Sequence, residues 1–393
     1  MPRLTSVAVA TWLLAACSGP DRHVSPPNPA PTSMMSAPPV TSGPAPSASV
    51  GPSPLASASA PVPPTPAPSA VASAAPELSE VHFVGRFDRD PPGPGATSTW
   101  SGTAFHARVR GTGASIRLSG ASGVYFEVRV DGERARVFST QRGERSYSLF
   151  RGRSLATYEV EVYRRNEASA GKVTYQGFEV DGGELVPSPP PYARRIEVLG
   201  DSITCGYGTE GPKGCTFSHA TESAYVSYAA VAARALNASA HLVCFSGKGL
   251  IQNYGGGKHE PMPQLYGRTL LHDKHDTWDF GHYPADVVVI NLGTNDISAE
   301  LEHDDFIEAY VSLLERARRL HPRALLVAIR WEHWGTSKQH LVSDAVKRFS
   351  DDRLLEIQFN IERDEGMGCD GHPSAETHGR LGKKLADLLR DRI

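Results

Sequence analysis

The chain divides into regions by the spacing of its apolar residues. From about residue 81 to 186, short runs alternate apolar and polar positions, and Gly-rich or Asp-Gly turns separate them. A period of two with no helical period predicts a β-sandwich. Strands are expected near residues 104–109, 115–118, 124–130, 158–163 and 173–180.

A different pattern follows the proline-rich hinge at residues 186–192. Apolar, β-branched runs alternate with stretches of helical period, which indicates βαβ units and a parallel sheet between two layers of helices. Strands are expected near 195–199, 241–245, 286–291, 324–330 and 354–359, and helices near 223–236, 304–320, 338–349 and 375–391. This alternation therefore predicts that residues 194–393 form one α/β domain with three layers.

The N-terminal residues show neither pattern. Residues 1–17 carry Arg3, then an apolar run, then small residues before Cys17, as in a secretory signal. Leu14-Ala15-Ala16-Cys17 looks like a bacterial lipobox, which would leave Cys17 lipidated and the protein anchored to a membrane of the cell envelope; ordinary signal cleavage is the alternative. Residues 18–76 hold 17 of the 31 prolines and no aromatic residue, which predicts a disordered tether.

Composition and charge exclude some classes of protein. A chain of 393 residues with 40% hydrophobic content is long enough for two cores. The net charge is −3, and the sequence has no Lys/Arg-rich stripe that could bind a phosphate backbone, so a nucleic-acid partner is not expected. The apolar run of the signal is too short to be a spanning helix.

Four polar loops follow strands or precede the last helix of the predicted α/β domain. They contain Ser202, Gly249, Asn295 and His372. Ligands bind where such loops gather at the carboxyl edge of a parallel sheet. A serine nucleophile needs a base, for which His372 is the candidate. The N–H groups of Ser202 and Gly249 and the side-chain amide of Asn295 are candidate donors to an oxyanion, with Gly247 as the alternative to Gly249. A lone Gly-Asp-Ser is more often a bare turn, but the four blocks together favour acyl transfer.

The four blocks resemble those of the SGNH (GDSL-like) hydrolases, whose four named residues head them. Their sequences are most similar to those of carbohydrate esterase family 2: GDSITCGYG, SGKGLIQNYGG, NLGTND and CDGHPS. Members of that family are bacterial acetylxylan and related polysaccharide O-acetyl esterases. The resemblance runs from about residue 81 to the end. It implies a jelly-roll sandwich before an SGNH domain, an acetylated polysaccharide as substrate, and no metal or organic cofactor.

Asp370 departs from the wider superfamily pattern. Most SGNH hydrolases place the aspartate three residues before the histidine, whereas Asp370 stands two before His372, as in the narrower family. Side chains at i and i+2 of an extended segment project to the same side, so Asp370 is expected to contact the imidazole. The alternative is that a backbone carbonyl orients the ring and Asp370 caps a turn.

Other polar and aromatic residues allow more than one interpretation. One or two disulfides are expected in an exported domain, with three full pairings open, although Cys205 and Cys244 could instead be small buried residues. The run 272–276 with His259 and His282 matches no defined metal-ligand spacing, and His378 more simply stabilises the last helix. The cysteines concerned are Cys205, Cys215, Cys244 and Cys369. A further set of side chains is expected either to line a sugar cleft or to pack in the core: Asn253, Tyr254, Trp278, Trp331 and Trp334.

The sequence thus predicts an exported serine esterase that removes O-acetyl groups from a polysaccharide such as xylan. One alternative is a lipase or thioesterase on the same scaffold, which would need an apolar acyl channel. Another is a carbohydrate-binding lipoprotein whose hydrolase domain is inactive. The sandwich would either bind carbohydrate or cap the neighbouring domain.

Overall fold

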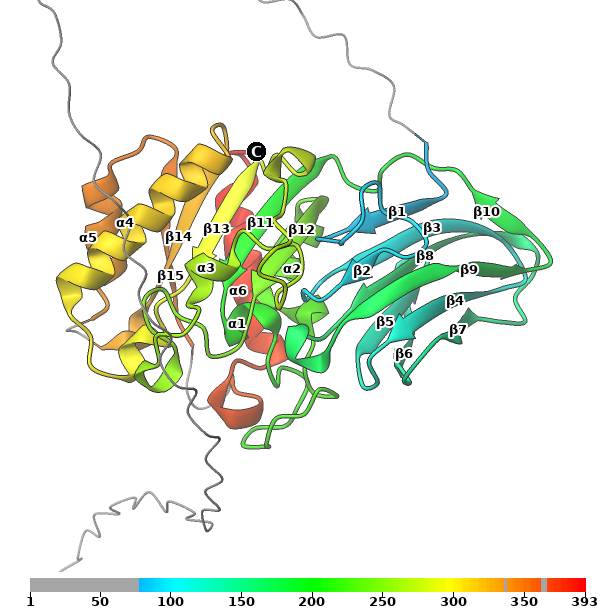
Figure 1. Ribbon diagram of the computed structural model, residues 1–393, viewed down its shortest axis with the longest axis horizontal. Coiled ribbons are helices and arrows are strands. Elements are labelled where there is room, and N and C mark those ends of the chain that lie inside the picture. Colours follow the sequence, from blue (N-terminus) through cyan, green and yellow to red (C-terminus); the bar gives the residue numbers. More distant parts are fainter. Residues whose placement is uncertain (1–77, 336–337, 362–365) are drawn as a thin grey trace, which may run out of the picture. The chain divides into compact units, whose positions relative to one another are not determined.

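The computed structural model describes residues 78–335, 338–361 and 366–393. The predicted signal, Cys17 and the predicted tether at 18–76 lie outside the described residues. Figure 1 shows a β-sandwich beside an α/β domain, so the predicted fold class is confirmed. No helix in the described ranges is both long and apolar enough to cross a membrane.

The sandwich consists of two antiparallel sheets. Alternate residues of β3 point inward, with Phe105, Ala107 and Val109 buried between the sheets, as the period of two predicts. One sheet has the order β1-β3-β8-β5-β6 with β10 also on β3, and the other has the order β2-β9-β4-β7. The strands are β1 (Val81–Val84), β2 (Thr97–Ser98), β3 (Ala104–Gly111), β4 (Gly113–Gly120), β5 (Tyr125–Val130), β6 (Glu133–Ser139), β7 (Arg145–Phe150), β8 (Ala156–Arg164), β9 (Val173–Asp181) and β10 (Glu184–Val186).

The α/β domain is built on a five-stranded parallel sheet of order β12-β11-β13-β14-β15. Its strands are β11 (Arg194–Gly200), β12 (Ala238–Cys244), β13 (Val287–Asn291), β14 (Leu325–Trp331) and β15 (Leu354–Phe359). The chain adds β12 on one side of β11 and β13 on the other. The order therefore reverses at β11, and in such sheets the crevice beyond that switch point is where ligands bind.

Helices cover both faces of this sheet, with α4 in front of it and α6 behind it in Figure 1. The helices are α1 (Ser202–Cys205), α2 (Tyr228–Ala235), α3 (Met262–Leu265), α4 (His303–Leu320), α5 (Leu341–Phe349) and α6 (Ala375–Leu389). Two start later than predicted. In α2 the side chain of Ser227 accepts a hydrogen bond from the N–H of Ala230, so the helix is capped there rather than near residue 223. In α5 the first helical residue is Leu341.

The sandwich and the α/β domain share a buried polar contact. Arg86, 1% exposed, pairs with Glu197 of β11 at 2.8 Å and donates to the carbonyl of Tyr266 at 2.6 Å. Glu197 also accepts from the Tyr266 hydroxyl and lies 3.0 Å from Nε2 of His321. Burial alone would raise the pKa of Glu197, but Arg86 and His321 outweigh it and hold that pKa at about 2. An arginine of the sandwich therefore neutralises a carboxylate in the core of its neighbour.

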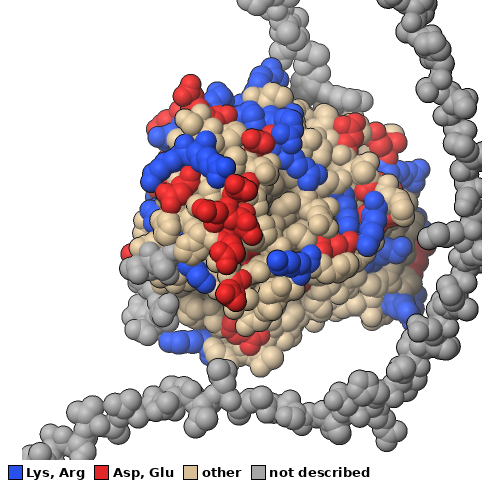
Figure 2. All heavy atoms as spheres, turned by 60° about the vertical axis from the view of Figure 1, so that its left-hand side comes forward, with Lys and Arg blue, Asp and Glu red and all other residues tan. Residues whose placement is uncertain are grey.

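The face around α4 carries charges of both signs. Acidic residues occupy the first turn of α4 and Arg318 and Arg319 its last turn, which complements the helix dipole. Figure 2 shows acidic and basic side chains side by side on this face.

Candidate active site

Ser202 lies at the carboxyl end of β11. The buried run Ile196, Val198 and Leu199 ends at Gly200, where a Cβ atom would lie 2.0 Å from Oγ1 of Thr204. Only glycine therefore lets the chain turn here directly into α1. Oδ1 of Asp201 caps the turn by accepting from the N–H of Ile203 at 3.0 Å. Ser202 is 8% exposed.

His372 stands against this serine. Its Nε2 is 2.8 Å from Oγ of Ser202, and its Nδ1 is 3.2 Å from the backbone carbonyl of Asp370. A carbonyl only accepts, so Nδ1 must carry the proton of the neutral ring, which leaves Nε2 free to accept from the serine hydroxyl. Burial lowers the pKa of His372, partly offset by the contact with Asp370. The ring is therefore held in the tautomer and the neutral state of a general base.

The structure does not show the predicted hydrogen bond between the Asp370 carboxylate and the imidazole. Asp370 has φ 47° and ψ 37° inside a short turn (η7, Cys369–Gly371), so the segment is not extended as the prediction assumed. Oδ2 of Asp370 accepts from the Tyr207 hydroxyl at 3.1 Å and from the N–H of Phe217 at 2.9 Å. The backbone carbonyl orients the ring, which is the alternative stated above.

Tyr207 is a site residue that the sequence reasoning missed. Its ring lies on His372, with centroids 4.2 Å apart, and stacks on Phe217 at 3.9 Å. Its place in the block GDSITCGYG, five residues after Ser202, was the available signal. The tyrosine restricts the imidazole from the side, while the carbonyl of Asp370 fixes its rotation.

Asn295 follows β13, the other strand at the switch point. Its Nδ2 donates to the carbonyl of Lys248 at 2.9 Å and lies 3.4 Å from Oδ2 of Asp201. Burial raises the pKa of Asp201 to about 7, with the nearby charge of Asp296 acting in the same direction. The Asn295 amide is thus tied both to the serine turn and to the glycine-rich loop.

The glycine-rich loop is held by Asp296, a second residue that the sequence reasoning missed. Its carboxylate accepts from three successive N–H groups, those of Leu250, Ile251 and Gln252, at 2.8 to 3.0 Å. A Cβ atom on Gly249 would lie 2.5 Å from Oδ2 of Asp296, so this close approach requires glycine. The N–H of Gly249 donates weakly to Oδ1 of Asn253 at 3.4 Å.

Two disulfides brace the loops around the site. Cys205–Cys244 joins α1 to the end of β12, and Cys215–Cys369 joins the loop after α1 to the turn before His372. Of the three open pairings, this is the one formed, and Cys205 and Cys244, for which the alternative was two small buried residues, are bonded to each other.

The three groups meet in one cavity of about 220 Å³. Its wall combines Ser202, Asn295 and His372 with a mostly apolar remainder: Ile203, Tyr254, Thr294, His333, Ile361, Met367, Gly371 and Pro373. Gly247 and Gly249 are not among the lining residues. Of the aromatic candidates, Trp331 and Trp334 are buried in the core and Trp278 packs against it, whereas Tyr254 borders the cavity and is 75% exposed.

Three of the histidines outside the site, His259, His282 and His378, have structural partners. His378 is fully buried in the first turn of α6, where its Nδ1 accepts from the N–H of Tyr228 at 3.0 Å. His282 pairs with Asp90 and Asp279, and His259 with Glu260. Within the described residues, no three His, Cys, Asp or Glu side chains are grouped as metal ligands would be.

A parallel α/β sheet with a serine–histidine pair at its switch point is typical of a serine hydrolase. Residues 198–380 match the GDSL-like lipase/acylhydrolase family, and residues 83–190 match the carbohydrate esterase 2 N-terminal domain. The fold resembles that of a family two carbohydrate esterase from Clostridium thermocellum in complex with cellohexaose. The two are 34% identical with a TM-score of 0.75, over 79% of this chain and 98% of that one. The protein belongs to carbohydrate esterase family 2.

Two other relatives are similar in sequence. The chain is 36% identical to the cellulase/esterase CelE of Acetivibrio thermocellus over 322 residues, which cover 79% of this chain and 39% of CelE. It thus spans well under half the length of that relative. It is 26% identical to an acetylxylan esterase/glucomannan deacetylase of Cellvibrio japonicus, over 75% of this chain and 84% of that one.

Proposed function

We propose that the protein is a serine esterase that removes O-acetyl groups from a polysaccharide. The observation that carries this proposal is the 2.8 Å contact between Oγ of Ser202 and Nε2 of His372 at the wall of a small cavity. Ser202 attacks the acetyl carbonyl while His372 takes its proton. When the bond between the acetyl carbon and the sugar oxygen breaks, His372 gives that proton to the departing oxygen, which leaves as a hydroxyl. Water then hydrolyses the acetyl-enzyme by the same route in reverse.

The oxyanion formed in each step needs donors near Ser202. We assign this role to the N–H of Ser202 and the side-chain amide of Asn295, which lines the cavity. The N–H of Gly249 is the third candidate, and it would exchange its long bond to Asn253 for the oxyanion.

The size of the cavity favours a short acyl group over a fatty acyl chain. About 220 Å³ lies below the range of roughly 300–1,000 Å³ typical of pockets for drug-sized ligands. An acetyl group and part of a sugar ring suit such a volume. The test is a chain-length series of p-nitrophenyl esters: we expect kcat/KM to fall steeply from acetate to octanoate. Equal or rising values along the series would favour the lipase or thioesterase alternative.

A second candidate is carbohydrate binding without turnover. It is favoured by the relative solved with cellohexaose and by the exposed ring of Tyr254 at the cavity mouth, since aromatic rings stack on sugars. A wild-type protein that binds cellohexaose in calorimetry but hydrolyses no acetyl ester would support this candidate over the first.

Replacing Asp370 by asparagine should reduce activity only slightly. The backbone carbonyl that contacts Nδ1 of His372 remains, and the new amide oxygen can still accept from Tyr207 and Phe217. We expect kcat on p-nitrophenyl acetate to fall by less than about 10-fold, against about 10⁴-fold where a carboxylate orients the histidine. A loss near the larger figure would show that the carboxylate acts on the imidazole.

The pH profile should report the buried imidazole. Burial lowers the pKa of His372 from the ordinary value of 6.5, and only the neutral ring acts as base. Activity is therefore retained above that lowered pKa and lost as the pH falls through it. We expect the acid limb of kcat/KM for p-nitrophenyl acetate to have its midpoint below pH 6.5. A midpoint above that value would contradict the assigned base.

We also propose that the protein is exported and held at a bacterial membrane by a lipid on Cys17. The proposal is supported by the sequence Leu14-Ala15-Ala16-Cys17 after an apolar run. Cys17→Ser should move the protein from the membrane fraction to the soluble fraction without changing its specific activity. Wild-type protein that is already soluble would contradict the anchor.

A further inference from the structure

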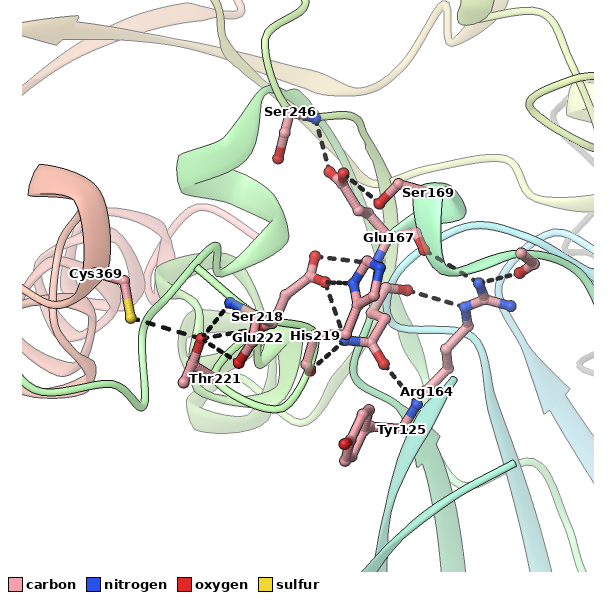
Figure 3. A network of polar contacts seen from close by, with 12 residues as sticks. Tyr125, Arg164, Glu167, Ser169, Ser218, His219, Thr221, Glu222, Ser246 and Cys369 are labelled. Carbon is pink, nitrogen blue, oxygen red and sulfur yellow. Dashed lines mark hydrogen bonds and ion pairs between the residues drawn. The ribbon is translucent and has the colours of Figure 1, made fainter. Parts of the chain in front are cut away.

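A short segment of the sandwich reaches the loops of the active site. After β8 the chain passes through Glu167 into a single turn of helix (η1, Ala168–Ala170). Glu167 is 3% exposed. Its carboxylate accepts from the N–H of Ser246 at 2.7 Å and from the Ser169 hydroxyl at 2.8 Å, as Figure 3 shows. Ser246 belongs to the α/β domain, so this contact crosses from one domain to the other.

Ser246 begins the glycine-rich loop beside the catalytic serine. Two residues further on, the carbonyl of Lys248 accepts from Nδ2 of Asn295 at 2.9 Å. The far end of the loop is held by Asp296. Carboxylates therefore fix the loop at both ends, and one of the two comes from the sandwich. A shift of Ser246 would carry the Lys248 carbonyl, and with it the Asn295 amide, away from its place near Ser202.

Glu167 is itself held by buried groups. Glu222, fully buried, accepts from the backbone N–H of Glu167 at 3.0 Å and from Nδ2 of Asn166 at 3.0 Å. The guanidinium of Arg164 donates to the carbonyls of Asn166 and Glu167 rather than to either carboxylate. Burial raises the pKa of Glu167 to about 7, with the charge of Glu222 as the second cause. Two neighbouring buried acids cost stability, and a costly arrangement of this kind is expected where a residue serves function.

We propose that Glu167 is a positioning residue for the oxyanion-binding loop. Its carboxylate fixes the N–H of Ser246 and thereby keeps the carbonyl of Lys248 and the amide of Asn295 in place for the transition state. It touches no reacting atom. The sandwich is, on this view, part of the catalytic unit and more than a cap. The inference rests on the proposed esterase function, because it assigns Glu167 to the oxyanion site of that reaction.

The test compares two conservative variants. Glu167→Gln keeps the length and an acceptor oxygen for Ser246, whereas Glu167→Asp keeps the charge but is one methylene too short to reach it. We expect Glu167→Gln to retain kcat on p-nitrophenyl acetate within about 3-fold. Glu167→Asp should lose about 10-fold or more in kcat with KM nearly unchanged, because small misplacements of an oxyanion donor are costly.

Thr99→Val is the matched control. It removes another buried bond between the domains, from the N–H of Leu271 to Oγ1 of Thr99 at 3.0 Å, on a loop that carries none of the assigned groups. It should lower the midpoint of thermal unfolding and leave kcat unchanged.

Two results would overturn the proposal. One is wild-type kcat in Glu167→Asp with only a lowered unfolding midpoint, which would make Glu167 a link between domains and nothing more. The other is a loss of kcat in Glu167→Gln, which keeps the acceptor oxygen for Ser246. That result would contradict the proposal even if Glu167→Asp does not fold. A wild-type protein without esterase activity would remove the proposed function and this inference together. An active wild type with an active Glu167→Asp would remove this inference alone.

Discussion

Ser202→Ala and His372→Ala should each lower kcat on acetyl esters by about 10³-fold or more. Each change removes one half of the 2.8 Å contact on which proton transfer depends. Without His372 the serine hydroxyl keeps its proton at neutral pH, and without Ser202 the imidazole has no nucleophile to activate. Steady-state rates on p-nitrophenyl acetate would measure both effects.

The double variant gives a sharper result than either single one. Because Ser202 and His372 act as a unit, their losses should not add, and the double variant should be about as slow as each single variant. Circular dichroism and unfolding midpoints control for misfolding. Losses that multiply would mean that the two residues act independently, and the assignment of a serine–histidine pair would be wrong.

Arg86→Met should lower the free energy of unfolding by about 3–5 kcal/mol, because it leaves a buried carboxylate without its cation. The guanidinium lies 2.8 Å from Glu197, and both side chains are almost fully buried. Methionine fills similar space but cannot neutralise Glu197 or satisfy the carbonyls of Tyr266 and Arg268. Urea titration followed by tryptophan fluorescence would measure the loss.

Arg108→Met is the matched control, because Arg108 pairs with Glu159 at 2.7 Å where the two side chains are 39% and 65% exposed. Its loss should cost less than about 1 kcal/mol. Equal effects of the two substitutions would show that the buried pair contributes no more than a surface pair.

The same contact determines how the α/β domain behaves alone. A fragment of residues 194–393 lacks Arg86. It also lacks Trp100 and Tyr163, two residues of the sandwich that pack in one hydrophobic cluster with the core of the α/β domain, so it exposes the apolar surface that they cover. We expect it to be poorly soluble. A well-folded fragment that has lost only its activity on polymers would instead favour carbohydrate binding by the sandwich.

The fold could be predicted because each domain has its own hydrophobic period. The prediction of element bounds from this period was wrong locally, where buried polar residues interrupt the apolar pattern. The strand predicted at residues 241–245 begins at Ala238, because the polar residue before the predicted start, Ser239, is buried against Tyr283. The Ser239 hydroxyl lies 2.9 Å from the Tyr283 hydroxyl. The His241 ring stacks on the Tyr283 ring, with the two centroids 3.4 Å apart. Polar residues with such partners look like a loop in the sequence.

The site was predictable only as far as each block acts locally. Ser202, Asn295 and His372 follow from strand ends, but the orientation of Asp370 depends on a distant segment. Its N–H donates to the carbonyl of Cys215, which the disulfide to Cys369 places beside it. No spacing within one block reveals such a contact. The same holds for Glu167, whose partner Ser246 is far away in sequence.

Acetate release from acetylated polysaccharides tests the proposed function most directly. Purified wild-type protein and Ser202→Ala would be incubated with acetylated xylan and acetylated glucomannan, and with p-nitrophenyl palmitate as the contrasting long-chain ester. We expect the wild type to release acetate from at least one of the two glycans, Ser202→Ala to release none, and neither to cleave the palmitate at a comparable rate. Release that is equal in Ser202→Ala, or cleavage of the palmitate alone, would contradict a serine polysaccharide deacetylase.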